Sequence, residues 1–283
     1  MLNIIYIMIA TSLKRTDMLI NKALYSIYNQ KNIDSKKIKI MIIDDNKDIN
    51  EIENIKIQVK KLRKKLNWND ENIFNTTIIK NQKTKYHSGT GSWNTAIEII
   101  NNKIIDSFIA ILDDDDHYAD DYIKKLFEIL DKKPKTIAIF SPLIWCSNNE
   151  KEILVLKKDD LTKEKFFIGN PGVQGSNMFF RAKILKEIDG FDEKLVSATD
   201  RDLMIRFIHY AIQNSLFYNI EILDKSYVFY NADNSNSISK NLEKKHLGLD
   251  VFYKKHKNNF SEEAYFKSLE RAKGLFDYNK IHS

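Results

Sequence analysis

Short runs of apolar residues alternate with amphipathic stretches through the first half of the chain. A continuous apolar run is typical of a strand buried on both faces of a parallel sheet, whereas apolar residues three and four positions apart are typical of a helix with one buried face. These patterns predict strands at 3–9, 38–43, 76–79, 107–112 and 136–141, and helices at 17–29, 52–66, 93–100 and 120–130. The alternation predicts an α/β fold, an open and mostly parallel sheet covered by helices.

The pattern changes after residue 141. Only short extended segments follow, together with a glycine-containing loop and one clear helix; they lie at 153–156, 178–181 and 220–223, at 169–175 and at 200–211. An amphipathic tail from residue 241 predicts one or two further helices that end near residue 277. We therefore expect one α/β domain over residues 1–230 and an α-helical C-terminal extension over residues 231–283, without an autonomous second domain.

Composition and charge narrow the class of protein. The 283 residues are 43% hydrophobic and 30% charged, which is ordinary for a globular chain. The net charge of +6 comes from basic residues that sit among acidic ones, so no nucleic-acid partner is expected. Cys146 is the only cysteine, and the apolar run 4–10 is too short to span a bilayer. These features favour a cytoplasmic protein, with peripheral contact at the inner face of the membrane left open.

Two acidic clusters follow predicted strands. Asp44 and Asp45 come after the second strand, and four consecutive aspartates, Asp113–Asp116, come after the strand 107–112. Ligands of open α/β sheets bind at the carboxyl ends of the strands. Four adjacent carboxylates repel one another, and a divalent cation with oxygen ligands would relieve the repulsion while leaving positions for phosphates. The alternative is a solvated acidic loop in which one aspartate caps the helix that begins near residue 120, although Asp120 or Asp121 is the better candidate for that cap.

Several segments together resemble glycosyltransferase family 2, the inverting enzymes with the GT-A fold. The resemblance covers roughly residues 3–210, and the matching segments occur in the family's order: Thr11-Ser12, Ser26–Gln30, Ile42–Asn46, Ile111–Asp116, Asp189–Asp192 and Thr199–Leu203. It implies a Rossmann-like, mostly parallel central sheet flanked by helices. It also implies a nucleotide-diphosphate sugar as donor, with a UDP-sugar favoured, and Mn²⁺ or Mg²⁺ as the metal.

The resemblance assigns the four consecutive aspartates to the donor and its metal. Asp113 would lie near the ribose or the metal, and Asp114 near the donor nucleotide. Asp115 and Asp116 would face the metal that bridges the diphosphate. His246 is a candidate for completing the metal site, although its lysine-rich helix is equally well read as a solvated face.

Other residues are assigned to the nucleotide and its phosphates. Thr11 would line the base and ribose pocket, and Asp45, with Asp44 beside it, would accept a hydrogen bond from the base. The loop 83–94 resembles the family's variable donor loop, in which Lys83 could neutralise diphosphate and Asn94 matches the family's asparagine. The alternative for this loop is a plain flexible connection.

The acceptor side is assigned to later segments. Asp200 would be the base that takes the proton of the acceptor hydroxyl; the alternative is that Thr199 or Asp200 is the N-cap of the following helix. Thr199 stands where the family carries Glu, so Asp202 is expected to contribute instead. The loop 170–177 lies where the family binds the sugar and acceptor. Its amide and hydroxyl side chains suit that role, and a structural turn is the alternative; they are Gln174, Ser176 and Asn177.

Other functions fit the sequence less well. A nucleotidyltransferase acting on sugar phosphates would show a glycine-rich loop after the first strand, and residues 10–15 contain no glycine. A prenyl-diphosphate enzyme would carry its aspartates on helices. A non-catalytic nucleic-acid-binding protein gives no reason for the aspartate run. We therefore predict transfer of a sugar to a hydroxyl of a glycan, lipid-linked or peptide acceptor.

Overall fold

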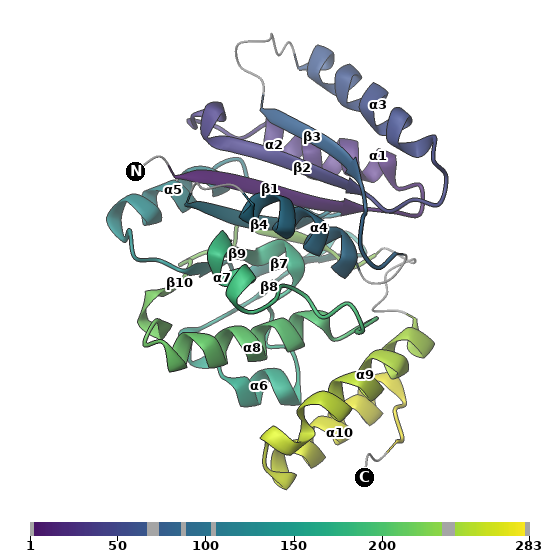
Figure 1. The fold of residues 1–283 in the computed structure, drawn as a ribbon, viewed down its shortest axis with the longest axis vertical. Helices are drawn as coiled ribbons and strands as arrows, with labels where there is room; N and C mark the ends of the chain where they lie inside the picture. Colours follow the sequence, from purple (N-terminus) through teal and green to yellow (C-terminus); the bar gives the residue numbers. More distant parts are fainter. Residues whose placement is uncertain (1–2, 67–73, 86–88, 103–105, 234–240, 281–283) are drawn as a thin grey trace.

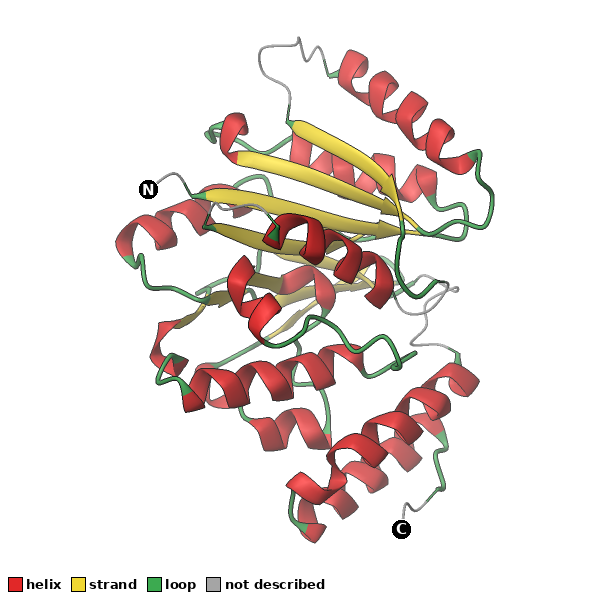
Figure 2. Ribbon diagram, viewed as in Figure 1, coloured by secondary structure: helices red, strands yellow, loops and turns green. Residues whose placement is uncertain are grey.

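A seven-stranded sheet forms the centre of the computed structural model, which describes residues 3–66, 74–85, 89–102, 106–233 and 241–280 (Figures 1 and 2). Its strand order is β10-β6-β9-β4-β1-β2-β3. All neighbours are parallel except β9, which runs antiparallel to β4 and β6. The strands are β1 Ile4–Thr11, β2 Ile38–Asp44, β3 Asn75–Lys80, β4 Ser107–Asp113, β6 Ala138–Phe140, β9 Met178–Arg181 and β10 Ile220–Ile222. The predicted α/β class and mostly parallel sheet are confirmed.

The register of the central strands brings the acidic segments to one edge. Thr11 pairs with Asp44 across β1 and β2, and Ala10 pairs with Asp113 across β1 and β4. Because these strands are parallel, their carboxyl ends meet at the same side of the sheet, where ligands of such folds bind.

Helices cover both faces of the sheet. Side chains alternate along β1, so that Ile5, Ile7 and Ile9 pack in one apolar cluster while Ile4 and Met8 pack in the other. The first cluster takes up the helical stretch after β1 together with α3 and α5, and the second takes up α4, α6, α7 and α8. These helices are α1 Thr16–Met18, a π-helical segment Leu19–Leu24, α2 Tyr25–Tyr28, α3 Glu51–Lys65, α4 Thr90–Asn101, α5 Tyr122–Lys132, α6 Lys163–Ile168, α7 Ala182–Glu187 and α8 Thr199–Gln213.

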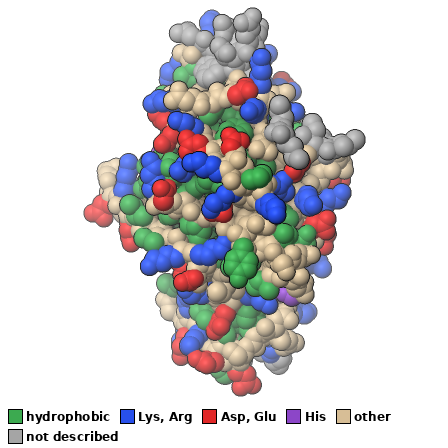
Figure 3. Space-filling model, turned by 90° about the vertical axis from the view of Figure 1, so that its left-hand side faces the viewer, with side chains coloured by type: hydrophobic (Ala, Val, Ile, Leu, Met, Phe, Trp, Pro, Cys, Tyr) green, Lys and Arg blue, Asp and Glu red, His purple; other side chains and the backbone are tan. Residues whose placement is uncertain are grey.

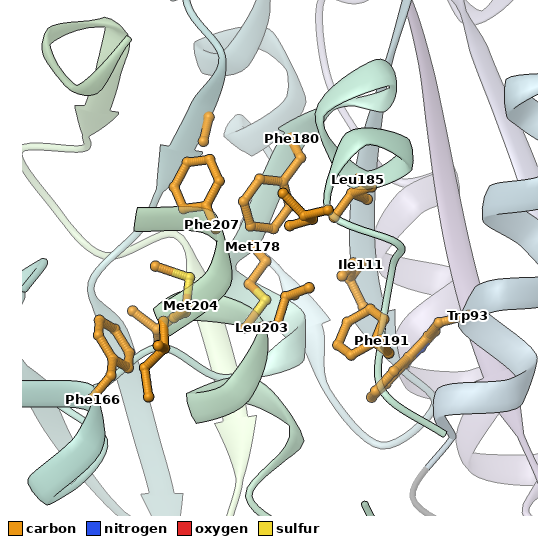
Figure 4. Close-up of a cluster of buried hydrophobic side chains, with 14 of the residues drawn as sticks. Trp93, Ile111, Phe166, Met178, Phe180, Leu185, Phe191, Leu203, Met204 and Phe207 are labelled. Carbon is orange, nitrogen blue, oxygen red and sulfur yellow. The ribbon is translucent and has the colours of Figure 1, made fainter. Parts of the chain in front are cut away.

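A close-packed aromatic core lies under α8 (Figure 4). Phe180 of β9 and Phe207 of α8 meet edge to face, with ring centroids 5.0 Å apart, and both are fully buried. Trp93 of α4 packs against Phe191 at 4.7 Å. Removing such a ring leaves a cavity and costs about 3–5 kcal/mol, so this core holds α8 against the sheet.

A second, four-stranded sheet was not predicted. Its order is β5-β11-β7-β8, formed by His117–Tyr118, Val228–Asn231, Leu143–Ser147 and Glu150–Leu154. β7 begins with the apolar residues Leu143–Cys146, which the sequence analysis did not assign to a strand, and most residues of this sheet are half-buried or exposed. Long-range pairing rather than local pattern decides such strands. The predicted segment 153–156 overlaps only the end of β8.

Two C-terminal helices, α9 Leu242–His256 and α10 Glu262–Phe276, form an antiparallel pair beside α6 and α8, as Figure 1 shows. Phe260 between them stacks on Phe167 of α6 with centroids 4.0 Å apart. Phe252 and Tyr253 of α9 belong to the same apolar cluster as the sheet. The predicted helical C-terminal extension is confirmed; it consists of two helices that pack on the core.

Charge is mixed over the surface at the amino ends of the strands. On this face Lys and Arg side chains are interspersed with Asp and Glu (Figure 3). Among the helices of the described residues, none is long and apolar enough to cross a membrane.

Candidate active site

A cavity of about 570 Å³ opens at the carboxyl edge of the sheet, a size that is typical of small-molecule sites. Eight separate segments line it. They are residues 10–15 after β1, 45–48 after β2, 89–93 at the start of α4, Asp113 and Asp115, 174–175, 197–200 at the start of α8, 230–231 of β11, and 244–245 of α9. Both acidic clusters of the sequence therefore contribute to one cavity, together with the start of α8.

The turn after β1 directs a guanidinium at the aspartate run. Leu13 and Lys14 have positive φ angles of 55° and 56°, an uncommon conformation for residues with a side chain. Their backbone is held in part by a 2.7 Å hydrogen bond from Lys14 N to Asn46 Oδ1. Arg15 then ion-pairs with Asp114 at 2.9 Å and with Asp115 at 3.6 Å. The sequence contained one signal for this contact: Arg15 follows one predicted strand and the aspartate run follows another.

The predicted nucleotide residues divide into two groups. Thr11 and Asp45 line the cavity, and Asp45 Oδ1 accepts a 2.9 Å hydrogen bond from Asn81 Nδ2. Asp44 is fully buried and does not line it. Its carboxylate forms a 2.5 Å ion pair with Lys80 and accepts hydrogen bonds from Asn46. Asp44 thus holds the turn that presents Asp45.

The four aspartates alternate between cavity and interior. Asp113 and Asp115 are half-buried and line the cavity, whereas Asp114 and Asp116 are buried. Asp116 Oδ2 accepts a 2.5 Å hydrogen bond from Ser176 Oγ, and Asp116 Oδ1 accepts one of 2.7 Å from Asn231 N. β4 ends at Asp113, and Asp114 and Asp115 form a turn that a 3.2 Å hydrogen bond from Asp116 N to the carbonyl of Asp113 closes, so the four side chains point in different directions.

Negative charge is concentrated in this run. Burial, followed by the nearby charges of Asp116 and Asp115, raises the pKa of Asp113 well above its ordinary range. Burial raises the pKa of Asp114 to about 7 against the lowering effect of Arg15, and burial and Asp115 raise the pKa of Asp116 to about 7. A cation placed among these groups would lower their pKa values by compensating their charge.

The carboxylates at the cavity fit a divalent cation that takes only some of its ligands from the protein. Asp113 and Asp115 present carboxylates to the cavity, while the oxygens of Asp116 already accept protein hydrogen bonds. Within the described ranges no three His, Cys, Asp or Glu side chains are arranged to hold a metal by themselves. His246 does not line the cavity, and its Nε2 lies 2.6 Å from the carbonyl oxygen of Phe276. Mg²⁺ and Mn²⁺ suit one or two carboxylates that are completed by phosphate and water.

Asp200 also lines the cavity, at the second position of α8, and its charge acts on Asp113. The N-cap of α8 is Ala198, with φ 61° and no side-chain cap, so the alternative prediction of Thr199 or Asp200 as N-cap is wrong. Asp200 Oδ1 is buried and has no hydrogen-bond partner in the described part of the chain. Burial raises the pKa of Asp200 to about 7, against a lowering effect of Lys245. Such a carboxyl group can accept a proton near neutral pH.

Asp202 lies one step further into the protein and does not line the cavity. Its Oδ1 accepts hydrogen bonds from His256 Nε2 at 2.8 Å and Lys255 Nζ at 2.7 Å, and its Oδ2 pairs with Arg206 at 2.8 Å. Burial raises the pKa of Asp202, but the hydrogen bond from His256 and the charges of Arg206 and Lys255 outweigh it and lower the pKa below its ordinary value. In this structure Asp202 ties α8 to α9.

The loop predicted for sugar and acceptor places one of its three candidates at the cavity. Gln174 lines it. Ser176 binds Asp116 and accepts a 3.0 Å hydrogen bond from Asp113 N. Asn177 is fully buried and donates to the carbonyl of Ser141 at 2.7 Å. Ser176 therefore holds the aspartate run in place, and Asn177 holds its own loop, without lining the cavity.

The two candidates from the donor loop also lie outside the cavity lining. Lys83 pairs with Glu98 at 2.6 Å. Asn94 donates to Glu193 at 2.7 Å and to the carbonyl of Phe191 at 2.8 Å. Residues 86–88 of that loop lie outside the described residues.

Several cavity residues had no predicted role. Trp93 was expected in the core, and the others received no role; they are Arg15, Tyr230, Lys244 and Lys245. The lysines belong to the tail that the sequence analysis placed outside the α/β domain, and nothing in their local pattern signals a cavity.

This fold and site define the class. A mostly parallel sheet flanked by helices, with an acidic strand end opening into a cavity and two C-terminal helices, is a GT-A glycosyltransferase fold. Similar solved structures share it. The crystal structure of S. aureus TarS 1-349 in complex with UDP has a TM-score of 0.55 at 17% identity, covering 98% of this chain and 72% of that one.

Two further structures show the same likeness. TarS 1-349 in complex with UDP-GlcNAc has a TM-score of 0.58 at 14% identity, covering 96% of this chain and 81% of that one. The mannosyltransferase PcManGT from Pyrobaculum calidifontis in complex with GDP-Man and Mn²⁺ has a TM-score of 0.57 at 14% identity, covering 96% and 69%. No curated protein matches the sequence. The family model described as Glycosyl transferase family 2 matches residues 15–189. The chain belongs to glycosyl transferase family 2 and is a glycosyltransferase.

Proposed function

We propose that this enzyme transfers a sugar from a nucleoside diphosphate donor to an acceptor hydroxyl with inversion at the anomeric carbon. One observation carries the proposal: Asp113 and Asp115 line the same cavity as Asp200, a half-buried residue whose Oδ1 has no hydrogen-bond partner among the described residues. The neighbours support the donor class, since TarS is seen with UDP-GlcNAc and PcManGT with GDP-Man and Mn²⁺. A UDP-sugar is the favoured donor.

The cavity residues divide the binding of such a donor between them. Thr11 and Asp45 would contact the nucleoside, because they lie at the carboxyl ends of β1 and β2. Asp113 and Asp115 would hold Mn²⁺ or Mg²⁺, which when bound stabilises negative charge on the leaving diphosphate. Arg15 keeps Asp115 in place and compensates the buried charge of Asp114.

Asp200 would act on the acceptor. The acceptor oxygen attacks the anomeric carbon from the face opposite the diphosphate, the bond from that carbon to the diphosphate oxygen breaks, and its electron pair leaves with the diphosphate. The acceptor proton passes to Asp200, whose pKa of about 7 suits a base near neutral pH. Glycan, lipid-linked and peptide acceptors all present such a hydroxyl, and a cytoplasmic location remains a prediction.

Thermal unfolding with a panel of nucleotides tests the donor assignment. With Mn²⁺ present, UDP at about 100 times its Kd should stabilise the protein by about 2.7 kcal/mol and raise the Tm, because a ligand that binds only the folded state shifts the equilibrium. Mn²⁺ alone, UMP and GDP are the matched controls. If no nucleoside diphosphate raised the Tm in the presence of Mn²⁺ or Mg²⁺, the proposal would be contradicted.

A further inference from the structure

The first turn of α9 reaches the active-site cavity beside the proposed base. Lys244 and Lys245 both line the cavity, together with the segment 197–200 that carries Asp200. Figure 1 shows the amino end of α9 on the same side of the molecule as the arrowheads of β1 and β2. Residues from the C-terminal tail are thus part of the cavity wall, although the matched family region ends at residue 189.

This placement of the lysines is rigid. A Cβ added to Gly248 would lie 2.1 Å from Ser197 Oγ and 2.7 Å from its backbone N, so α9 touches the segment before Asp200 directly. Ser197 Oγ also donates to the carbonyl of Lys245 at 3.3 Å. At the other end of α9, His256 binds the buried Asp202 of α8. α9 is therefore held at its amino end by the segment before α8 and at its carboxyl end by α8 itself.

The charge of Asp200 acts on Lys245, and Glu243 lies in the same turn of α9, but neither carboxylate forms an ion pair with the two lysines. Both lysines lie in the first turn of α9, where the helix dipole already favours negative groups. Lys245 is half-buried, and its ammonium lies over the ring of Phe276 at 5.0 Å. Neither lysine has an ion pair within 4.0 Å among the residues that the structure describes. Two half-buried cations at a helix amino end are unfavourable in isolation, and a bound anion would compensate them.

The position in the cavity indicates which anion. Arg15 forms ion pairs with Asp114 and Asp115 of the run assigned to the diphosphate and its metal, whereas α9 packs on Ser197, in the segment that carries the proposed base Asp200. Building on the proposed function, we infer that Lys244 and Lys245 bind a phosphate group of the acceptor, close to the hydroxyl that is glycosylated. The acceptor is then a phosphorylated molecule, and its phosphate is carried either by a soluble sugar or by a lipid.

Binding to the donor-loaded enzyme tests this inference. The full chain, saturated with UDP and Mn²⁺, is titrated calorimetrically with glucose 6-phosphate and with glucose as the neutral match. We expect glucose 6-phosphate to bind at least about tenfold more tightly, because a charge-assisted contact contributes that much. Lys244→Gln/Lys245→Gln should remove the difference and leave the Kd of UDP unchanged. Lys254→Gln, an exposed lysine on the same helix, is the matched control and should keep it.

A second arm separates the two sources of phosphate. Sedimentation with phosphatidylcholine vesicles, with and without phosphatidic acid, reports a lipid-borne phosphate if the double variant binds less than Lys254→Gln does. If neither arm distinguished the double variant from Lys254→Gln, the inference would be wrong.

A weaker Kd for UDP in the double variant would also overturn the inference, by assigning the lysines to the diphosphate. Should the double variant unfold, Lys245→Met with Lys245→Arg as rescue replaces it. Failure of the wild type to bind UDP would instead contradict the proposed function.

Discussion

Two carboxylates two residues apart on α8 have opposite environments. Asp202 is enclosed by His256, Lys255 and Arg206, and its pKa is lowered. Asp200 lines the cavity, one of its oxygens lacks a partner among the described residues, and its pKa is raised to about 7. The protein satisfies the carboxylate of Asp202, whereas one oxygen of Asp200 has no partner in the described part of the chain. The contrast supports a structural role for Asp202 and the proposed role of Asp200 as the base.

The largest expected effect is on catalysis. Asp200→Asn keeps the shape of the side chain but cannot accept a proton, so the rate of sugar transfer should fall by about 10²–10⁴-fold. Binding of UDP should be unchanged, and the two are measured by product formation and by calorimetry. Asp131→Asn, a change of an exposed aspartate in α5 that does not line the cavity, is the matched control. Transfer at the wild-type rate in the Asp200 variant would remove it as the base.

A large effect on stability is expected from substitution of Asp202. Asp202→Asn leaves Lys255 and Arg206 without their buried counter-charge, and breaking a buried pair in this way costs about 3–5 kcal/mol. Urea unfolding followed by circular dichroism measures the loss. Asp200→Asn, assayed in parallel at pH 7, should show no comparable loss. Equal destabilisation by both variants would contradict the contrast between the two sites.

The metal assignment predicts a difference within the aspartate run. Asp115→Ala removes a cavity carboxylate and should reduce Mn²⁺-dependent turnover by about 10²–10³-fold, while the free energy of unfolding changes little. Asp116→Asn removes a buried charge that accepts from Ser176 and Asn231, so its main effect should be on stability. Steady-state rates across a Mn²⁺ titration make the measurement. Turnover of the wild type that survives EDTA would count against the metal.

The smallest expected effect is a difference in the pH dependence of stability, measured without metal or nucleotide. The folded pKa of Asp202 is lowered, so its contribution is present above the unfolded value of about 4 and is lost as the pH falls through the lower folded value. The folded pKa of Asp200 is raised to about 7, so folding binds a proton and wild-type stability declines as the pH rises from about 4 to 7.

Two variants make this difference measurable. Asp200→Asn should be more stable than the wild type at pH 8, with the gap narrowing toward pH 4. The deficit of Asp202→Asn should instead shrink only below about pH 4. Urea unfolding at a series of pH values tests both. Parallel pH curves for the two variants would show that the environments do not differ as described.

Much of the site was predictable because it depends on strand ends. Apolar runs located β1, β2 and β4, and in a parallel sheet their carboxyl ends must share an edge, which places Thr11, Asp45 and Asp113 near one another. Local pattern could not decide which member of each pair faces the ligand. Asp44 and Asp45 were treated alike, and only the contact of Asp44 with Lys80 from the next strand separates them.

The sequence by itself determined the order of strands and helices, the mostly parallel sheet and the acidic edge, because periodicity and strand-end position are local properties of the chain. Tertiary structure alone decided the second sheet, the pairing of Arg15 with the aspartates, and the arrival of Lys244 and Lys245 beside Asp200. Each of these depends on segments that are far apart in sequence and meet only when the core packs, and no local pattern encodes such meetings.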